Sequence, residues 1–218
     1  MTSRFPGLTV LAAVALLGSA VAGTPRNPDL SITRPEADTR FPPFTRVLLE
    51  PVEIEFRPSE PLAGTGNTTG NRTEFPPTEA DQQRLEADAN RILREELAKN
   101  ESVELTDKPG PGVLVLKPAL RDIVWRLPSE EPPGSRIYLD NVADLTFAVD
   151  FADGESGRPL GRAEDRRSAE PIATGPGDFG AVRANRVSAG VEWRRVLRKW
   201  GRRLDTRVEQ LYFEAKPR

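Results

Sequence analysis

The sequence switches between two hydrophobic periodicities, and their order along the chain constrains the fold more than any other feature. Leu145, Phe147, Val149 and Phe151 are separated by single residues of mostly polar character, a spacing typical of a strand with one buried face. Residues 79–99 and about 187–211 instead place apolar side chains three and four positions apart. That spacing predicts two amphipathic helices.

The rest of the chain contains further strand patterns. The predicted strands are Arg46–Phe56, Val103–Thr106, Val113–Trp125, Ile137–Phe151 and Arg158–Ala169. The last two flank Asp153 and Gly154, which indicate a hairpin turn and antiparallel pairing. Pro51 predicts an edge or a bulge in the first strand. The order strand-helix-strand-strand-strand-strand-helix predicts an α+β fold, with a mostly antiparallel sheet of about five strands covered by two helices.

The first residues have the features of a secretory signal peptide. An early cation, Arg4, precedes the apolar run Leu8–Leu17, and Ala20-Val21-Ala22 precede Gly23. The run is shorter than the roughly 20 residues that span a bilayer, and an A-x-A sequence is a typical cleavage site. We therefore expect a periplasmic or otherwise exported protein whose signal peptide, residues 1–22, is cleaved after Ala22.

Composition predicts the domain organisation of the remaining chain. Residues 23–44 are rich in Pro, Thr, Arg and Asp without apolar periodicity, which predicts a disordered linker. A single α+β domain is expected over 45–213, with a flexible loop at 57–77 that contains several Gly, Pro and Asn residues. Residues 214–218 are expected to form a tail.

The sequence contains neither cysteine nor histidine. Disulfides, thiolate metal sites, a lipobox cysteine and an imidazole base are therefore excluded. A net charge of −2, with 29% charged residues, argues against general binding of nucleic acid. We expect a non-enzymatic protein with no catalytic residues, no cofactor and no metal site, stabilised by a packed apolar core.

The second predicted helix carries many cations beside two tryptophans. The candidate partner or membrane surface consists of Trp193, Arg194, Arg195, Arg198, Lys199, Trp200, Arg202 and Arg203. A basic amphipathic helix with interfacial aromatic residues binds anionic membranes or acidic partners. The alternative is a solvated helix face with tryptophans in the core. In that case acids of the first helix could neutralise the cations: Glu86, Asp88, Glu95 and Glu96.

Acidic residues gather around the predicted hairpin: Asp122, Asp140, Asp144, Asp150, Asp153 and Glu155. Two carboxylates in one cleft could act as acid and base in glycoside hydrolysis or bind a hard cation. Acids at alternate strand positions usually mark the solvent face instead. The glycine-rich segment Thr174–Gly180 lacks the Lys-Ser/Thr pair of a phosphate loop. Asp165-Arg166-Arg167 predicts local ion pairs.

Several segments together resemble one known family. They are Val47–Val52 in the form Val-Leu-Leu-Glu-Pro-Val, the helix Leu85–Leu97, the strand entry Pro109–Leu114, Asp165-Arg166-Arg167 after the hairpin, and the final helix around Trp200. The family is the uncharacterised bacterial envelope lipoproteins catalogued as domain of unknown function 3313. The resemblance covers roughly Arg46 to Leu211. It implies an α+β envelope domain with no established activity, whose members typically carry the lipobox cysteine that is absent here.

Three functions are open at this point. The favoured hypothesis is a binding or assembly module that meets an unknown envelope protein or surface. One alternative is a carboxylate-dependent envelope hydrolase, which requires two acids among Asp122, Asp140, Asp144 and Asp150 to share a pocket. The other is peripheral contact with an anionic membrane through the basic helix.

Overall fold

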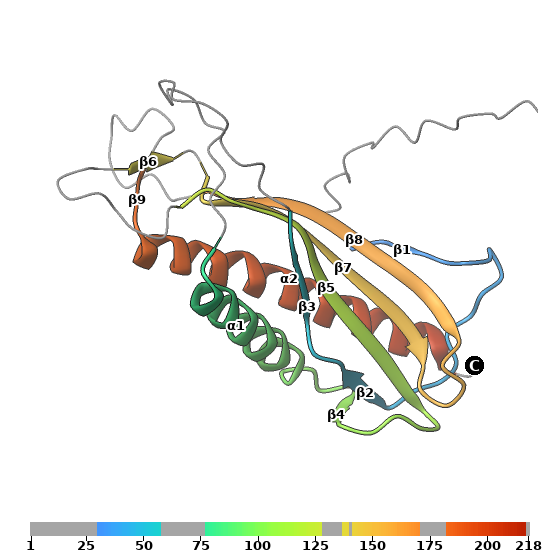
Figure 1. Ribbon diagram of the computed structural model, residues 1–218. Coiled ribbons are helices and arrows are strands. Elements are labelled where there is room, and N and C mark those ends of the chain that lie inside the picture. Colours follow the sequence, from blue (N-terminus) through green and yellow to red (C-terminus); the bar gives the residue numbers. More distant parts are fainter. Residues whose placement is uncertain (1–29, 58–76, 128–136, 140, 171–181, 217–218) are drawn as a thin grey trace, which may run out of the picture.

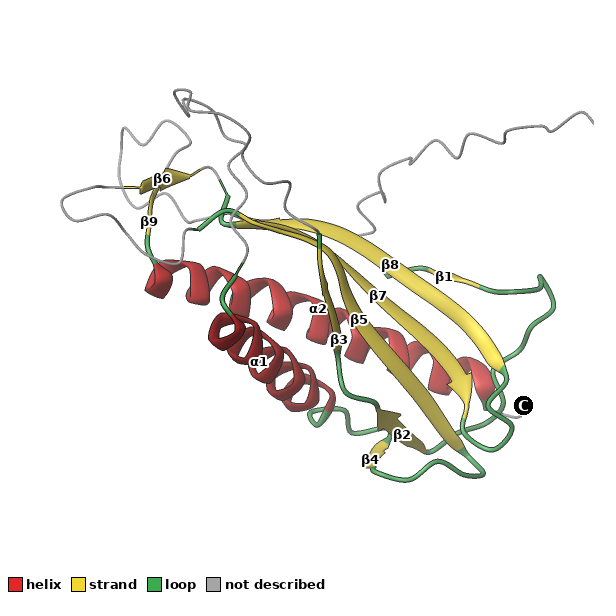
Figure 2. Ribbon diagram, in the orientation of Figure 1, coloured by secondary structure: helices red, strands yellow, loops and turns green. Residues whose placement is uncertain are grey.

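The computed structural model describes residues 30–57, 77–127, 137–139, 141–170 and 182–216. Within them, two helices cover one face of a mixed sheet, so the fold class is α+β (Figures 1 and 2). The elements are β1 (Ile32–Thr33), β2 (Arg46–Leu49), β3 (Glu53–Phe56), α1 (Glu79–Leu97), β4 (Glu104–Thr106), β5 (Val113–Trp125), β6 (Ile137–Leu139), β7 (Ala143–Asp153), β8 (Pro159–Ala169), β9 (Val182–Ala184) and α2 (Arg186–Ala215). The main sheet has the order β1-β8-β7-β5-β2-β4. β3 also pairs with β5, along a later part of that strand than β2 does. β6 and β9 form a separate two-stranded sheet.

The main sheet is mixed and seven-stranded in the described residues, which corrects the prediction of a mostly antiparallel sheet of about five strands. β2 is parallel to β4 and β5, and β3 is parallel to β5. The cause is α1, because a strand–helix–strand connection brings the chain back to the same end of the sheet. The predicted antiparallel hairpin of β7 and β8 is confirmed, and β5 also pairs antiparallel with β7.

The predicted strand Arg46–Phe56 is divided into β2 and β3 at Pro51. Proline has no amide hydrogen for a ladder, and the irregularity predicted there takes the form of a break. The amide of Val52 donates instead to Oδ1 of Asn90 on α1, at 2.8 Å. This bond fixes the middle of α1 to the break, while β2 and β3 pair with successive parts of β5.

The hydrophobic core lies between the sheet and the two helices. Alternate residues of β7, including Leu145, Phe147 and Phe151, are at most 1% exposed and belong to one cluster with both helices. α1 contributes Leu85, Ala89, Ile92, Leu93 and Leu97. In the described part of the chain, neither helix is long and apolar enough to cross a membrane.

Part of the predicted linker packs on the domain. β1 pairs antiparallel with β8, and Leu30, Phe41 and Phe44 are buried. The ring of Phe41 meets that of Phe151 edge to face, with centroids 6.0 Å apart. The domain therefore starts by Leu30, earlier than composition predicts, because isolated apolar anchors in a Pro-rich segment produce no periodic signal.

The other boundaries agree with the predictions to differing degrees. β5 has the predicted bounds, and α1 is two residues shorter than expected. α2 continues to Ala215, two residues beyond the predicted domain end. The predicted signal peptide at 1–22 and nearly all of the predicted loop at 57–77 lie outside the described residues.

The two helices pack side by side and run in the same direction. Arg194 of α2 donates to Asp88 of α1, and Asn100 after α1 donates to Asp205 of α2 at 2.7 Å. The paired residues are 106 and 105 positions apart in the sequence, so the two helices keep nearly the same register along their length. Gly201 marks a close approach, because a Cβ at this position would lie 2.8 Å from Cβ and Cγ of Glu96.

Replacing Gly201 by alanine should destabilise the fold. In a helix interior this change normally adds up to about 1 kcal/mol of stability. Here the added methyl group would push the helices apart, so we expect a net loss of about 1–3 kcal/mol, typical of overpacking. Urea unfolding, monitored by tryptophan fluorescence, measures the difference.

Gly190→Ala is the matched control on the same helix. Its new Cβ would meet only the flexible guanidinium group of Arg194, 3.3 Å away. Stability should therefore be unchanged or slightly higher. Equal stabilisation by both substitutions would contradict the close helix contact at Gly201.

Candidate functional site

The candidate surface lies on α2, whose start is fixed by a capping box. The amide of Ser188 donates to Oδ1 of Asn185, and the amide of Asn185 donates to Oγ of Ser188, both at 2.9 Å. These two bonds satisfy amides that a helix start leaves without partners. The cap thereby fixes the residue at which the 30-residue helix begins.

Both tryptophans of the candidate surface belong to the core. Trp193 is 1% exposed and Trp200 is fully buried, in agreement with the alternative of core tryptophans. The indole of Trp200 stacks on Phe147 of β7, with ring centroids 5.1 Å apart. Its Nε1 donates to Asp165 of β8 at 2.9 Å. These two contacts set the rotation of α2 about its axis and remove the tryptophans from the exposed surface.

Asp165 is a buried acid surrounded by cations. Its Oδ2 lies 2.6 Å from Nε of Arg167 and 3.3 Å from Nη1 of Arg203. Arg203 therefore points toward the sheet. Arg166, on the opposite face, pairs with Asp122 at 3.6 Å. The local ion pairs predicted for Asp165-Arg166-Arg167 are confirmed.

The six cations of the predicted surface divide into two groups. Three have acidic partners: Arg203 with Asp165 at 3.3 Å, Arg194 with Asp88 at 3.3 Å, and Arg195 with Glu192 at 2.6 Å. The others are Arg198, Lys199 and Arg202, which are exposed and form no ion pair within the described residues. We call these three the cationic face.

The acids of α1 do not neutralise the cationic face, although the two helices are neighbours. Arg91 contacts Asp88 at 2.7 Å and Glu95 at 2.9 Å. The hydrogen bonds that Arg91 donates to these two acids, Asp88 first, raise the pKa of Arg91 above its usual value. Glu96 pairs with Lys99 at 2.7 Å. The acids are thus largely engaged within α1, and Asp88 alone among these three also pairs with α2.

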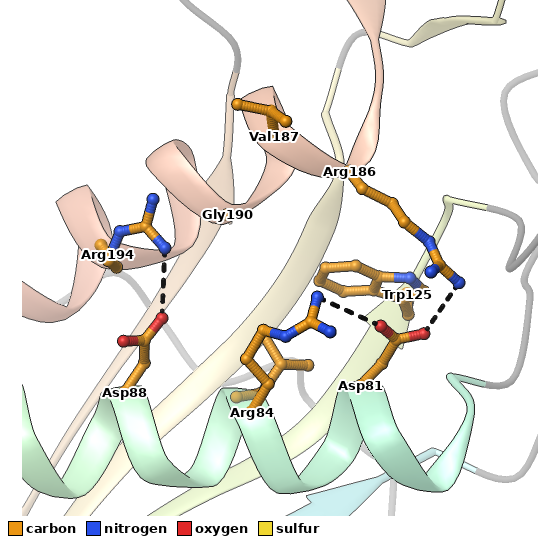
Figure 3. Close-up of a pocket in the computed structure, with 9 residues that line it drawn as sticks. Asp81, Arg84, Asp88, Trp125, Arg186, Val187, Gly190 and Arg194 are labelled. Atoms are coloured by element: carbon orange, nitrogen blue, oxygen red, sulfur yellow. Dashed lines mark hydrogen bonds and ion pairs between the residues drawn. The ribbon is translucent and has the colours of Figure 1, made fainter.

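A pocket of about 290 Å³ lies between the first halves of the two helices (Figure 3). It is lined by Asp81, Arg84, Leu85, Asp88, Trp125, Arg186, Val187, Gly190 and Arg194. Two ion pairs connect the helices here, Asp81 with Arg186 and Asp88 with Arg194, each at 3.3 Å. Figure 3 shows the indole of Trp125, from the end of β5, between the helices.

Of the residues that line this pocket, the sequence placed only Arg194 in the candidate surface, and it indicated Asp88 only as an acid that could neutralise the cations of the second helix. The others come from α1, from the end of β5 and from the first turns of α2, segments far apart in the chain. The regular spacing of Asp81 and Asp88 on α1, and of Arg186 and Arg194 on α2, was the available signal. It becomes informative only with the parallel register of the two helices.

The described acidic residues around the hairpin do not line this pocket. Three of these aspartates form ion pairs with arginines: Asp122 with Arg57 at 3.2 Å, Asp144 with Arg126 at 2.6 Å, and Asp150 with Arg162 at 2.9 Å. In the turn, the hydroxyl of Ser156 donates to Asp153 and lowers the pKa of this carboxyl below its usual value. Asp140 and Thr174–Gly180 lie outside the described residues.

The buried ion pairs of Asp165 should make a large contribution to stability. Asp165→Ala would leave Arg167, which is only 5% exposed, as an uncompensated buried charge. Breaking such a pair costs about 3–5 kcal/mol. We expect a loss of that size in urea unfolding.

Asp150→Ala supplies the control, because it also removes an acid from an ion pair with arginine. Asp150 is on the open face of the sheet, and its side chain is 45% exposed. Exposed pairs contribute at most about 1 kcal/mol. Similar losses for both variants would show that burial of Asp165 has no special effect.

Comparison with known proteins gives one family and several structures. The model of the family "Protein of unknown function (DUF3313)" matches residues 37–193. No curated protein sequence gives a significant match. A neuraminyllactose-binding hemagglutinin homologue from Helicobacter pylori is similar in structure, with 12% identity, a TM-score of 0.41, and coverage of 84% of this chain and 95% of that one.

Two further structures are similar at the same low level. A PelC dodecamer from Paraburkholderia phytofirmans has 12% identity and a TM-score of 0.36, with coverage of 80% of this chain and 96% of that one. A DUF330 protein from Xanthomonas campestris has 9% identity and a TM-score of 0.37, with coverage of 81% and 93%.

Proposed function

The chain belongs to the DUF3313 family of proteins of unknown function, and on that premise we propose that it is a non-enzymatic binding or assembly module of the bacterial envelope. Export by the predicted signal peptide is part of the proposal. The observation that carries it is the cationic face of α2, which the fold leaves exposed and without an ion pair in the described residues.

The cationic face suits an acidic partner. Arg198, Lys199 and Arg202 lie within five residues of one helix. Burial of Trp193 and Trp200 holds these cations on the solvent side. Exposed charges of one sign accelerate association with a surface of the other sign and select against wrong partners. Screening acts over about 8 Å at physiological salt, so such binding should weaken as salt is raised.

A protein partner is favoured over a membrane surface. A cation close to an anionic bilayer contributes about 1 kcal/mol, so the three cations supply about 3 kcal/mol. That is less than the roughly 4 kcal/mol of a millimolar dissociation constant. Membrane-surface helices add interfacial aromatic residues, whereas Trp193 and Trp200 are in the core.

A binding role is also favoured over hydrolysis by paired carboxylates. Asp122, Asp144 and Asp150 each form an ion pair with a different arginine. The pocket between the helices does contain two acids, Asp81 and Asp88, but arginines hold both of them. A glycosidase needs one carboxyl that donates a proton, and ion-paired carboxylates are poorly suited to that role.

Photo-crosslinking in intact cells tests the proposal. A photoreactive amino acid placed at Glu209, on the exposed side of α2 beyond the cationic face, should give a discrete protein adduct. The triple variant Arg198→Gln, Lys199→Gln, Arg202→Gln should reduce that adduct about tenfold or more, because rim charges control association. Quantitative blotting of the adduct gives the result.

The control triple variant is Arg40→Gln, Lys108→Gln, Arg158→Gln. It removes three exposed cations that lie apart on the domain, so the change in net charge is identical. This variant should retain the adduct. Equal loss in both variants, or no discrete adduct at all, would contradict a specific acidic partner. Salt-sensitive sedimentation with anionic vesicles would support the membrane alternative instead.

A further inference from the structure

The pocket between α1 and α2 has the composition of a small-molecule site. Its volume of about 290 Å³ is at the lower limit of ligand pockets, which usually measure about 300–1,000 Å³. One part of the lining is apolar, from Leu85, Trp125 and Val187. The other part consists of charged groups on both helices. A ligand that fits would therefore be small and have one apolar and one charged part.

Among the described residues of the lining, the formal charges leave an excess of one positive charge. Three arginines face two carboxylates: Arg84, Arg186 and Arg194 against Asp81 and Asp88. A fourth cation, Arg91, touches Asp88 from outside the pocket and also pairs with Glu95. The first turns of both helices add partial positive charge at the same end of the domain. The pocket is thus suited to a ligand with a single negative charge.

Two arginines of the pocket are held loosely enough to engage a ligand. Nη1 of Arg84 lies 3.7 Å from Asp81, and the Arg84 side chain is 63% exposed. Arg194 makes one hydrogen bond of 3.3 Å to Asp88. A guanidinium group has five N–H donors and pairs with a carboxylate through two parallel bonds. Both arginines therefore have donors to offer.

The apolar side of the pocket is positioned to receive a ring or a short chain. Figure 3 shows the indole of Trp125 between the two bridging ion pairs, with Val187 on the first turn of α2. Val187 lies at the rim of the pocket and is 76% exposed, which is an unusually high exposure for a large apolar side chain. Gly190 has no side chain to fill the space, and the guanidinium of Arg194 lies beside it.

From these observations we propose that the pocket binds a small monocarboxylate with an apolar ring or chain. Its carboxylate pairs with Arg84 and Arg194, and its apolar part lies against Trp125 and Val187. This binding site is separate from the cationic face, so its existence does not depend on the proposed partner.

Titration of the full chain with three matched compounds tests the proposal. Phenylacetate has both parts of the expected ligand, phenylacetamide lacks the charge, and acetate lacks the ring. The chain has three tryptophans, and a Trp125→Phe variant identifies the indole N–H signal of Trp125 in an NMR spectrum. Phenylacetate should shift that signal saturably, and the other two compounds should bind at least about fivefold more weakly, because each lacks one of the two contacts.

Variants on one helix distinguish the pocket from general attraction of anions. Arg194→Gln should weaken phenylacetate about fivefold to tenfold, since it removes a charge-assisted bidentate pair. Arg198→Gln, four residues later on the solvent side, should change the affinity less than about twofold, as screening weakens distant exposed charges. Both positions are at the surface of α2, so folding should be retained.

Three results would overturn the proposal. They are the absence of a saturable shift of the Trp125 signal, equal binding of phenylacetamide and phenylacetate, and equal effects of Arg194→Gln and Arg198→Gln. None of them bears on the cationic face, whose test is the crosslinking experiment. The two proposals can therefore fail independently.

Discussion

The stacking of Trp200 on Phe147 is the contact on which the arrangement of α2 depends. The same indole donates to the buried carboxylate of Asp165, which in turn holds Arg167 and Arg203. One side chain thus joins the helix to two adjacent strands, by an apolar contact to β7 and a polar one to β8. An aromatic pair adds about 0.5–1.5 kcal/mol beyond its burial. The acceptor also satisfies an indole N–H that would otherwise be buried without a partner. Once α2 has this rotation, the positions of its other residues follow, with Arg194 toward α1 and Arg198 toward solvent.

The sheet topology explains why both helices start at the same end of the domain. β5 and β8 run in the same direction because each pairs antiparallel with β7. α2 runs opposite to β8, since Arg195 reaches Glu170 at the end of the strand and Trp200 reaches Asp165 within it. α1 runs opposite to β5, as required by a crossover between parallel strands. The helices are therefore parallel to each other, and their first turns meet beside Trp125. The connection that makes the sheet mixed also creates the pocket.

The sequence predicted the local elements better than their assembly. The alternation in β7 and the spacing of Leu85, Ala89 and Leu97 in α1 are properties of neighbouring residues, so they are visible without a structure. Parallel pairing is not, because it depends on where the chain returns after α1. The anchors Leu30, Phe41 and Phe44 were missed for a related reason, since each packs alone from a segment without periodicity. At the site, the cations of α2 were recognisable, but whether each has a partner depends on acids from other elements.

The two glycines of α2 show how a local disadvantage can point to a site. Each costs about 1 kcal/mol relative to alanine in a helix interior, so each calls for a compensating feature. Gly201 has one in the close contact with Glu96 of α1. Gly190 has no backbone neighbour that requires the absence of a side chain, and its nearest atoms belong to the guanidinium of Arg194. What Gly190 provides is space beside Arg194, in a lining that also includes Trp125. At this position α2 is less stable than it would be with alanine, and one turn earlier it exposes Val187. Both features are expected where a helix lines a binding pocket, and neither is expected of a surface optimised for folding alone.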